Sequence, residues 1–247
     1  GAQGLLQPVR QIARIDLSDL REVDGQKERL LRNTEQFVGG RPANNVLLTG
    51  ARGTGKSSLI KALLNKYASR GLRVIEVEKQ DLVDLPEIVE LIAARPERFV
   101  LYCDDLSFEA DEPGYKALKV VLDGSVAAAS ENCLIYATSN RRHLMPEYMS
   151  ENLEAKRVDD EIHPGETVEE KISLSERFGL WLSFYPFSQG EYLAIVEQWL
   201  QHFGVTPSEI EAARQPSLVW ALERGSRSGR IAYQFARDHV GRQKIQA

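Results

Sequence analysis

The sequence of 247 residues predicts an α/β protein, with a parallel β-sheet covered by helices on both faces and a small helical domain after it. Short apolar segments alternate with segments of helical periodicity up to residue 187. The apolar segments are nearly continuous, as expected of parallel strands that are buried on both faces. From residue 188 onward only helical patterns occur, so we predict a core over residues 1–187 and a helical lid over residues 188–247.

The predicted elements follow one another along the core in a regular order. Strands have short apolar sequences and cover residues 45–49, 73–78, 98–105, 132–140 and 180–187. Core helices have apolar residues at helical spacing and cover residues 19–40, 57–70, 84–95 and 114–125. Lid helices are predicted at residues 188–204, 206–225 and 228–241. Residues 150–170 are acidic with few apolar side chains, which predicts a mobile loop.

Composition and charge exclude several classes of protein. The net charge of −5 and the pI near 5.6 give no general attraction to nucleic acid or anionic lipid. No apolar run approaches the roughly 20 residues of a membrane span, and the first residues lack a signal-peptide pattern. Cys103 and Cys133 lie inside apolar runs and predict buried free thiols. We expect a cytoplasmic protein without membrane association.

The segment GARGTGKS, from Gly50 to Ser57, fits the pattern G-x-x-x-x-G-K-[ST] between a predicted strand and a predicted helix. Its glycines allow the backbone to wrap around phosphate oxygens at a helix N-terminus. Lys56 is expected to reach the β- and γ-phosphates, and Ser57 to ligate Mg²⁺. The alternative is a glycine turn that begins an ordinary helix. The predicted nucleotide-binding residues are Gly50, Arg52, Gly53, Thr54, Gly55, Lys56, Ser57 and Ser58.

Two carboxylates end the predicted strand over residues 98–105. Paired acids at the end of a buried strand are costly unless a cation or solvent compensates them. We therefore expect Asp104 to hold Mg²⁺, in part through water, and Asp105 to polarise the attacking water. The alternative is a solvated strand end. Glu109, four residues further on, is interpreted as a surface acid.

Asn140 ends the predicted strand that should lie beside the one ending in Asp104. An amide at this place can orient a water molecule without carrying charge, so we predict a catalytic role. The alternative is an asparagine that forms a turn after the strand. Thr138 and Ser139 are weaker candidates.

Two arginines are candidates for contact with a nucleotide. Arg177 lies between the acidic segment and the last strand. Arg230 follows Ser228, a good N-cap, and so lies in the first turn of the last helix. A cation there opposes the helix dipole at a cost of roughly 0.3–1 kcal/mol, which a nearby γ-phosphate would reverse. Arg227 competes for this role, and a surface arginine is the alternative in each case.

Taken in chain order, these features resemble an AAA+ ATPase, with a three-layer P-loop NTPase core and a C-terminal lid. The residues similar to Walker A, Walker B, sensor 1, the arginine finger and sensor 2 are, in that order, Gly50–Ser57, Asp104-Asp105, Asn140, Arg177 and Arg230. The segments NTEQFVGGRPANNVLLTGARGTGKSSLIKALL, CDDLSFE and YATSNRRHL are similar to a bacterial AAA+ family catalogued as a domain of unknown function.

This resemblance implies the strand order 5-1-4-3-2, with ATP or ADP and Mg²⁺ bound between core and lid. It also implies a homo-oligomer, either a ring or an open helical assembly, in which Arg177 acts in trans. One departure is Asp105, because most AAA+ ATPases have glutamate there, and we therefore expect slow hydrolysis. The expected function is ATP hydrolysis that moves the lid against the core on an unknown partner. The alternatives are a nucleotide-gated switch with negligible hydrolysis and a DNA-associated, initiator-like or loader-like ATPase.

Overall fold

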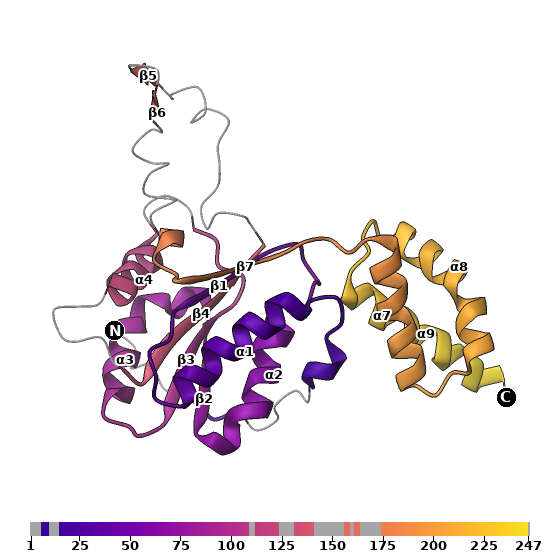
Figure 1. Ribbon diagram of the computed structural model, residues 1–247, viewed down its shortest axis with the longest axis horizontal. Helices are drawn as coiled ribbons and strands as arrows, with labels where there is room; N and C mark the ends of the chain where they lie inside the picture. The colour runs from indigo at the N-terminus through magenta and orange to yellow at the C-terminus, as the bar shows by residue number, and fades with distance from the viewer. Residues whose placement is uncertain are drawn as a thin grey trace.

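The core is a five-stranded parallel sheet in the order β2-β3-β4-β1-β7 (Figure 1). The computed structural model describes residues 6–9, 15–108, 112–123, 131–140, 156–158, 161–163 and 174–246. The strands are β1 (Val46–Gly50), β2 (Leu72–Val77), β3 (Arg98–Cys103), β4 (Cys133–Ser139) and β7 (Leu180–Phe184). The predicted α/β class and the predicted order 5-1-4-3-2 are confirmed. β3 and β7 end earlier than predicted, so both acids after β3 lie beyond the strand.

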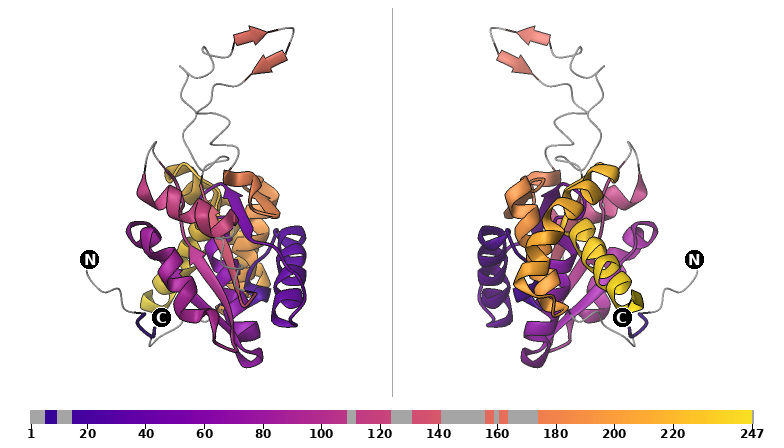
Figure 2. Two further views of the ribbon diagram at one scale, coloured as in Figure 1. Left: turned by 90° about the vertical axis from the view of Figure 1, so that its left-hand side faces the viewer. Right: turned by 90° about the vertical axis from the view of Figure 1, so that its right-hand side faces the viewer.

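Helices cover both faces of this sheet (Figure 2). They are α1 (Asp24–Val38) and α2 (Lys56–Tyr67) on one face, and α3 (Leu85–Ala93) and α4 (Pro113–Asp123) on the other. Leu48 packs in the cluster with α1 and α2, whereas Leu47 packs in the opposite cluster, and both are fully buried. β1 is therefore apolar at consecutive positions because each of its faces contacts a helical layer.

The first predicted helix was wrong at its beginning. Instead of continuous helix from residue 19, the chain forms a 3₁₀ turn over Leu17–Asp19 and adopts a left-handed backbone at Glu22, with φ of 62°. Two long-range hydrogen bonds hold the segment before α1. The side chain of Asn65 donates to the Ile15 carbonyl (3.0 Å), and that of Gln198 donates to the Ser18 carbonyl (3.0 Å). The segment before α1 is therefore linked to α2 through Asn65 and to the lid helices through Gln198.

The three predicted lid helices are present as α7 (Gln189–His202), α8 (Pro207–Glu223) and α9 (Gly229–Gln246). A reciprocal cap begins α7, because the Glu191 N–H donates to Ser188 Oγ (3.3 Å) and the Ser188 N–H donates to the Glu191 carboxylate (2.7 Å). These helices pack together at one end of the core (Figure 1). The predicted boundary at residue 187 falls in the connection between β7 and α7.

The remaining predictions for the core concern loops and cysteines. Of the acidic segment, the structure describes only β5 (Lys156–Val158) and β6 (Glu161–His163), which pair antiparallel. The rest of that segment and Glu109 lie outside the described residues. Cys103 and Cys133 are free thiols, the first buried and the second half-buried. No helix in the described ranges has the length and apolar character needed to cross a bilayer.

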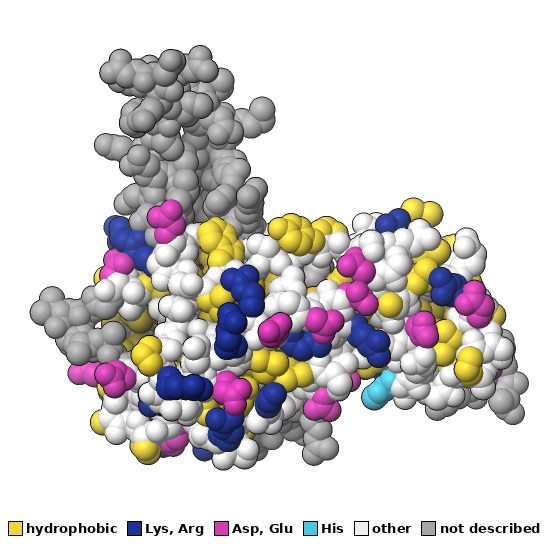
Figure 3. All heavy atoms as spheres, viewed as in Figure 1, with side chains coloured by type: hydrophobic (Ala, Val, Ile, Leu, Met, Phe, Trp, Pro, Cys, Tyr) yellow, Lys and Arg dark blue, Asp and Glu magenta, His cyan; other side chains and the backbone are white. Residues whose placement is uncertain are grey.

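Basic and acidic side chains are interspersed over the face of the molecule shown in Figure 3. Exposed ion pairs occur among the described residues, for example Arg70 with Glu35 (3.2 Å). This mixed charge agrees with the small net charge of the whole sequence.

Candidate nucleotide site

A cavity of about 660 Å³ lies between the core and the lid, beyond the carboxyl ends of β1, β3 and β4. It brings together most of the predicted site residues, which come from four separate parts of the sequence. Those that line it are Arg52, Gly53, Thr54, Gly55, Lys56, Ser57, Ser58, Asp104, Asp105, Asn140 and Arg230. Two predicted site residues do not line it, namely Gly50 and Arg177.

Gly50 shapes the loop from behind. Its φ is 123°, and a Cβ atom there would lie 1.8 Å from the Phe184 carbonyl oxygen. The same oxygen accepts a hydrogen bond from the Ala51 N–H (3.1 Å). The loop can therefore approach β7 this closely only with glycine at position 50, and the turn that follows directs the N-terminus of α2 toward the cavity.

Lys56 lies at the floor of the cavity with only 6% of its surface exposed. Its ammonium group donates to the carbonyls of Gly50 (2.8 Å) and Ala51 (2.7 Å) and to Asn140 Oδ1 (3.1 Å). Burial lowers the pKa of Lys56 to about 8, although the nearby carboxylates of Asp105 and Asp104 act in the opposite direction. A bound polyphosphate would restore the charged form.

Asp104 and Ser57 form the candidate magnesium site. Ser57 Oγ donates to Asp104 Oδ1 (2.9 Å), and Thr138 Oγ1 donates to the same oxygen (2.5 Å). Partial burial by itself raises the pKa of Asp104, but hydrogen bonding from Thr138, the nearby Tyr102 hydroxyl and Ser57 outweighs it, so the pKa is lowered. Asp104 therefore remains an anion at neutral pH.

The donors suit Mg²⁺, which takes oxygen ligands and keeps several of its waters. Tyr102 Oη is buried beside Ser57 and Asp104, so its hydroxyl lies close to where such a water would bind. Within the part of the chain that the structure describes, no group of three or more His, Cys, Asp or Glu side chains could hold a metal. A cation held by Ser57 and Asp104 would take its other ligands from phosphate and water.

The side chains of Asp105 and Asn140 are in direct contact at the floor of the cavity. Asn140 Nδ2 donates to Asp105 Oδ1 (2.5 Å) while Asn140 Oδ1 accepts from Lys56. Asp105 has a left-handed backbone with φ of 50°, a conformation that costs an L residue of order 1–3 kcal/mol. The turn that carries the acid is held in this strained form by surrounding contacts.

The start of α9 lies directly on the glycine-rich loop over residues 50–57. The Gly229 N–H donates to the Gly53 carbonyl (2.9 Å), and a Cβ atom on Gly53 would meet Ser228 Oγ at 2.8 Å. Ser228 also caps α9 by accepting from the Ile231 N–H (3.3 Å). Arg230 lies in the first turn of α9 and lines the cavity beside this loop. Arg227 does not line the cavity.

The apolar end of the cavity is lined by side chains that were not among the predicted site residues. Ile15, Leu20 and Val23 line it from the segment before α1. Trp199 and Tyr233 line it from the lid, with ring centroids 4.7 Å apart. The apolar segment that contains Trp199 predicts a core position, but its side chain is half-buried and reaches the cavity. Its spacing along α7 is the same as that of core residues, so no sequence signal separated the two.

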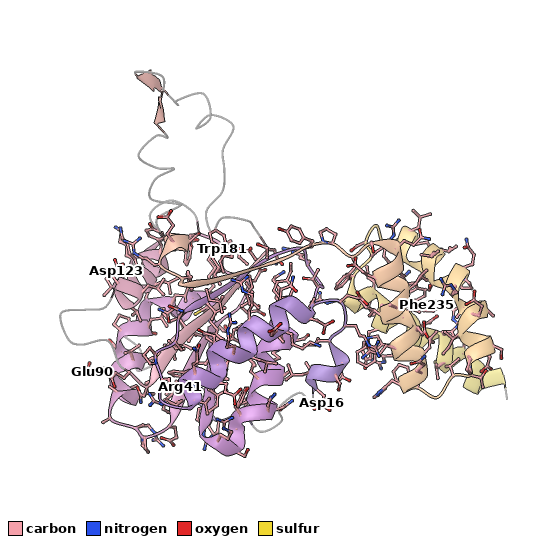
Figure 4. The ribbon with its side chains drawn as sticks, viewed as in Figure 1. Asp16, Arg41, Glu90, Asp123, Trp181 and Phe235 are labelled. Atoms are coloured by element: carbon pink, nitrogen blue, oxygen red, sulfur yellow. The ribbon has the colours of Figure 1, made fainter. Side chains whose placement is uncertain are left out.

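Arg177 lies away from this cavity. Its Nε atom is paired with the carboxylate of Asp123, the last residue of α4. Asp123 lies at the end of the core that is farthest from the lid (Figure 4). The structure therefore does not bring Arg177 together with the other predicted site residues of the same chain.

A family model described as "Protein of unknown function (DUF815)" matches residues 1–243. A comparison with curated protein sequences finds no significant match.

Several solved structures resemble the fold. RuvB of Thermotoga maritima, a Holliday junction branch migration motor, is 17% identical, with a TM-score of 0.55 over 94% of this chain and 67% of that one. Orc1 of Aeropyrum pernix, in complex with DNA, is 14% identical, with a TM-score of 0.62 over 96% and 62%. A chain of the HORMA:CdnC:Trip13 complex of E. coli MS115-1 is 12% identical, with a TM-score of 0.55 over 90% of each chain. At these identities the likeness is one of fold.

Proposed function

Since this chain belongs to the DUF815 family and has the fold of an AAA+ ATPase, we propose that it binds ATP with Mg²⁺ and hydrolyses it at an interface between copies of the chain. The hydrolysis would move the lid against the core on a partner protein or on DNA. One observation carries the proposal: in a single cavity, hydrogen bonds link Lys56 through Asn140 to Asp105, next to the pair formed by Ser57 and Asp104.

The two ends of the cavity fit the two ends of a nucleotide. Backbone N–H groups of the loop over residues 50–57 and the N-terminus of α2 would bind the phosphates. Lys56 would neutralise the β- and γ-phosphates, and Arg230 would approach them from the lid. The adenine ring would lie at the apolar end, between the segment before α1 and the rings of Trp199 and Tyr233.

Ser57 and Asp104 would hold Mg²⁺, which neutralises charge on the β- and γ-oxygens when it is bound. Asp105 would accept a hydrogen bond from the attacking water, and Asn140 would fix the direction of that carboxylate. The aspartate side chain is one methylene shorter than the usual glutamate.

A second copy of the chain is needed to complete the site. In its own chain, Arg177 pairs with Asp123 at the end of the core that is opposite the lid, and it does not line the cavity. An arginine that contacts the γ-phosphate in the transition state is worth roughly 10³–10⁵ in rate. We infer that Arg177 of one subunit acts at the cavity of the next, so that an isolated subunit hydrolyses ATP very slowly.

The decisive experiment measures ATP turnover per subunit against protein concentration, with the molecular mass determined in the same samples. We expect turnover to rise as the oligomer forms and Arg177→Ala to reduce it about 10³-fold or more while ATP binding is kept. Lys56→Ala should lose both. Arg41→Ala, at an exposed position on the core, is the matched control and should behave as the wild type. Turnover that does not depend on concentration, with Arg177→Ala unchanged, would refute the trans arrangement.

The same samples separate the two alternative functions. If the chain is a nucleotide-gated switch, it should bind ATP and ADP tightly without turnover at any protein concentration. Asp105→Asn should then leave both the nucleotide affinity and the absent turnover unchanged. A DNA-associated ATPase predicts DNA binding that weakens steeply as salt is raised, because binding releases counterions. The basic segment over residues 224–244 is the region to neutralise in that case.

A further inference from the structure

Thr138 contacts both acids of the site with a single hydroxyl group. It lies near the end of β4 with 1% of its surface exposed. Its Oγ1 atom donates to Asp104 Oδ1 (2.5 Å) and accepts from the Asp105 N–H (2.9 Å). The backbone joins the same contact, because the Leu106 N–H donates to the Thr138 carbonyl (2.7 Å). The turn that carries both acids is thus bound to β4 on either side.

The contact with Asp104 fixes which oxygen faces the metal site. Asp104 Oδ1 accepts from Thr138 Oγ1 (2.5 Å), from Ser57 Oγ (2.9 Å) and from the Asp105 N–H (3.1 Å). A carboxylate oxygen has two lone pairs, so three donors saturate it. These three bonds hold the carboxylate in one rotation, and we infer that Oδ2 is the oxygen that faces a cation.

The contact with Asp105 acts on the backbone. The residue has φ of 50°, and its N–H would otherwise bond only to the neighbouring Asp104 Oδ1 (3.1 Å). A left-handed non-glycine residue persists only where its surroundings hold it. The short bond from the Asp105 N–H to Thr138 Oγ1 supplies this restraint and so places the carboxylate against Asn140.

We propose that Thr138 is a positioning residue that orients both acids, so that metal affinity and turnover depend on its hydroxyl group. The inference rests on the proposed Mg·ATP function. The alternative is a purely structural role, in which the threonine hydroxyl is hydrogen-bonded only because it is buried in a strand. In that case, loss of the hydroxyl lowers stability and affects nucleotide binding equally with and without Mg²⁺.

The test compares Thr138→Val with Thr138→Ser in the full chain. The readouts are the Mg²⁺ concentration that half-saturates ATP turnover, the turnover rate at saturating Mg²⁺, and the affinity for ADP without Mg²⁺. Thr49→Val is the matched control, because Thr49 is buried on the adjacent strand β1 and its hydroxyl accepts from Trp181 Nε1 (2.9 Å). Thr138→Ala joins the series because it differs from Thr138→Ser by the hydroxyl alone, in case the valine variant does not fold.

We expect Thr138→Val to raise the half-saturating Mg²⁺ concentration about 10- to 100-fold, the range found when a partner that orients a metal ligand is removed. ADP affinity without Mg²⁺ should stay within about twofold, and Thr138→Ser should stay close to the wild type. Equal values for Thr138→Ser and Thr138→Ala, or a shift in Thr49→Val as large as that in Thr138→Val, would overturn the inference. A wild type whose ADP binding and turnover ignore Mg²⁺ altogether would overturn the proposed function and this inference with it.

Discussion

Nucleotide binding should be coupled to uptake of a proton by Lys56. The side chain is buried against two carbonyls and Asn140, and its burial lowers the pKa to about 8. Phosphate oxygens placed beside the ammonium favour its charged form and raise this pKa again. Binding ADP at a pH above 8 should therefore draw a proton from the buffer.

The size of the effect follows from the pKa and from the pH of the experiment. With a pKa of about 8, Lys56 of the free protein holds about 0.2 proton at pH 8.5 and about 0.9 at pH 7. If the bound lysine is fully charged, ADP binding takes up about 0.8 proton at pH 8.5 and about 0.1 at pH 7. The same shift makes the nucleotide-free protein gain stability from about pH 8 to pH 10.5, because the unfolded chain binds the extra proton over that window.

Calorimetric titration of ADP in buffers of different ionisation enthalpy measures this uptake directly. Cys103 and Cys133 do not interfere, because burial raises the pKa of each thiol to about 12. Lys56→Arg is the control, since a guanidinium stays charged at both pH values and leaves no proton to take up. Uptake at pH 8.5 no larger than at pH 7, in a protein that binds ADP tightly, would refute the reasoning.

Two further predictions concern the stability of the fold and the apolar end of the cavity. Tyr136→Phe should lower the free energy of unfolding by about 1–3 kcal/mol in urea titrations, because its hydroxyl contacts Asn33 Nδ2 (3.1 Å) and Thr34 Oγ1 (2.9 Å) in a buried setting. ADP should change the tryptophan fluorescence of the wild type, and Trp199→Phe should abolish this change because Trp199 and Tyr233 line the cavity. A signal that survives Trp199→Phe would show that the base binds elsewhere.

Features that depend on local geometry could be predicted from the sequence. The glycine loop over residues 50–57 could be predicted because glycine conformations and the beginning of α2 are set within a few residues. Asp104 and Asp105 could be singled out because paired acids at the end of a buried strand are costly, and the parallel sheet places Asp104 near the loop. Consecutive apolar residues such as Leu47 and Leu48 likewise indicated burial on both faces of β1.

Features that depend on contacts distant in the sequence were decided by the tertiary structure. Trp199 has the spacing of a core residue, and only the packing of the lid on the core makes it a wall of the cavity. The segment over residues 15–20 lies beside the cavity, where Asn65 donates a hydrogen bond to the Ile15 carbonyl and Gln198 donates one to the Ser18 carbonyl. No local sequence pattern predicts these two contacts.

The chemistry of the site was divided in the same way. A glycine-rich loop, two acids and an amide at the ends of neighbouring strands can be recognised in the sequence, because each feature is a short run of residues. That Thr138 bonds to both acids and that Arg177 pairs with Asp123 outside the cavity depends on how the chain packs. Side-chain partners of this kind depend on strand register and on the docking of helices, and many sequences that share the same motifs would place them differently.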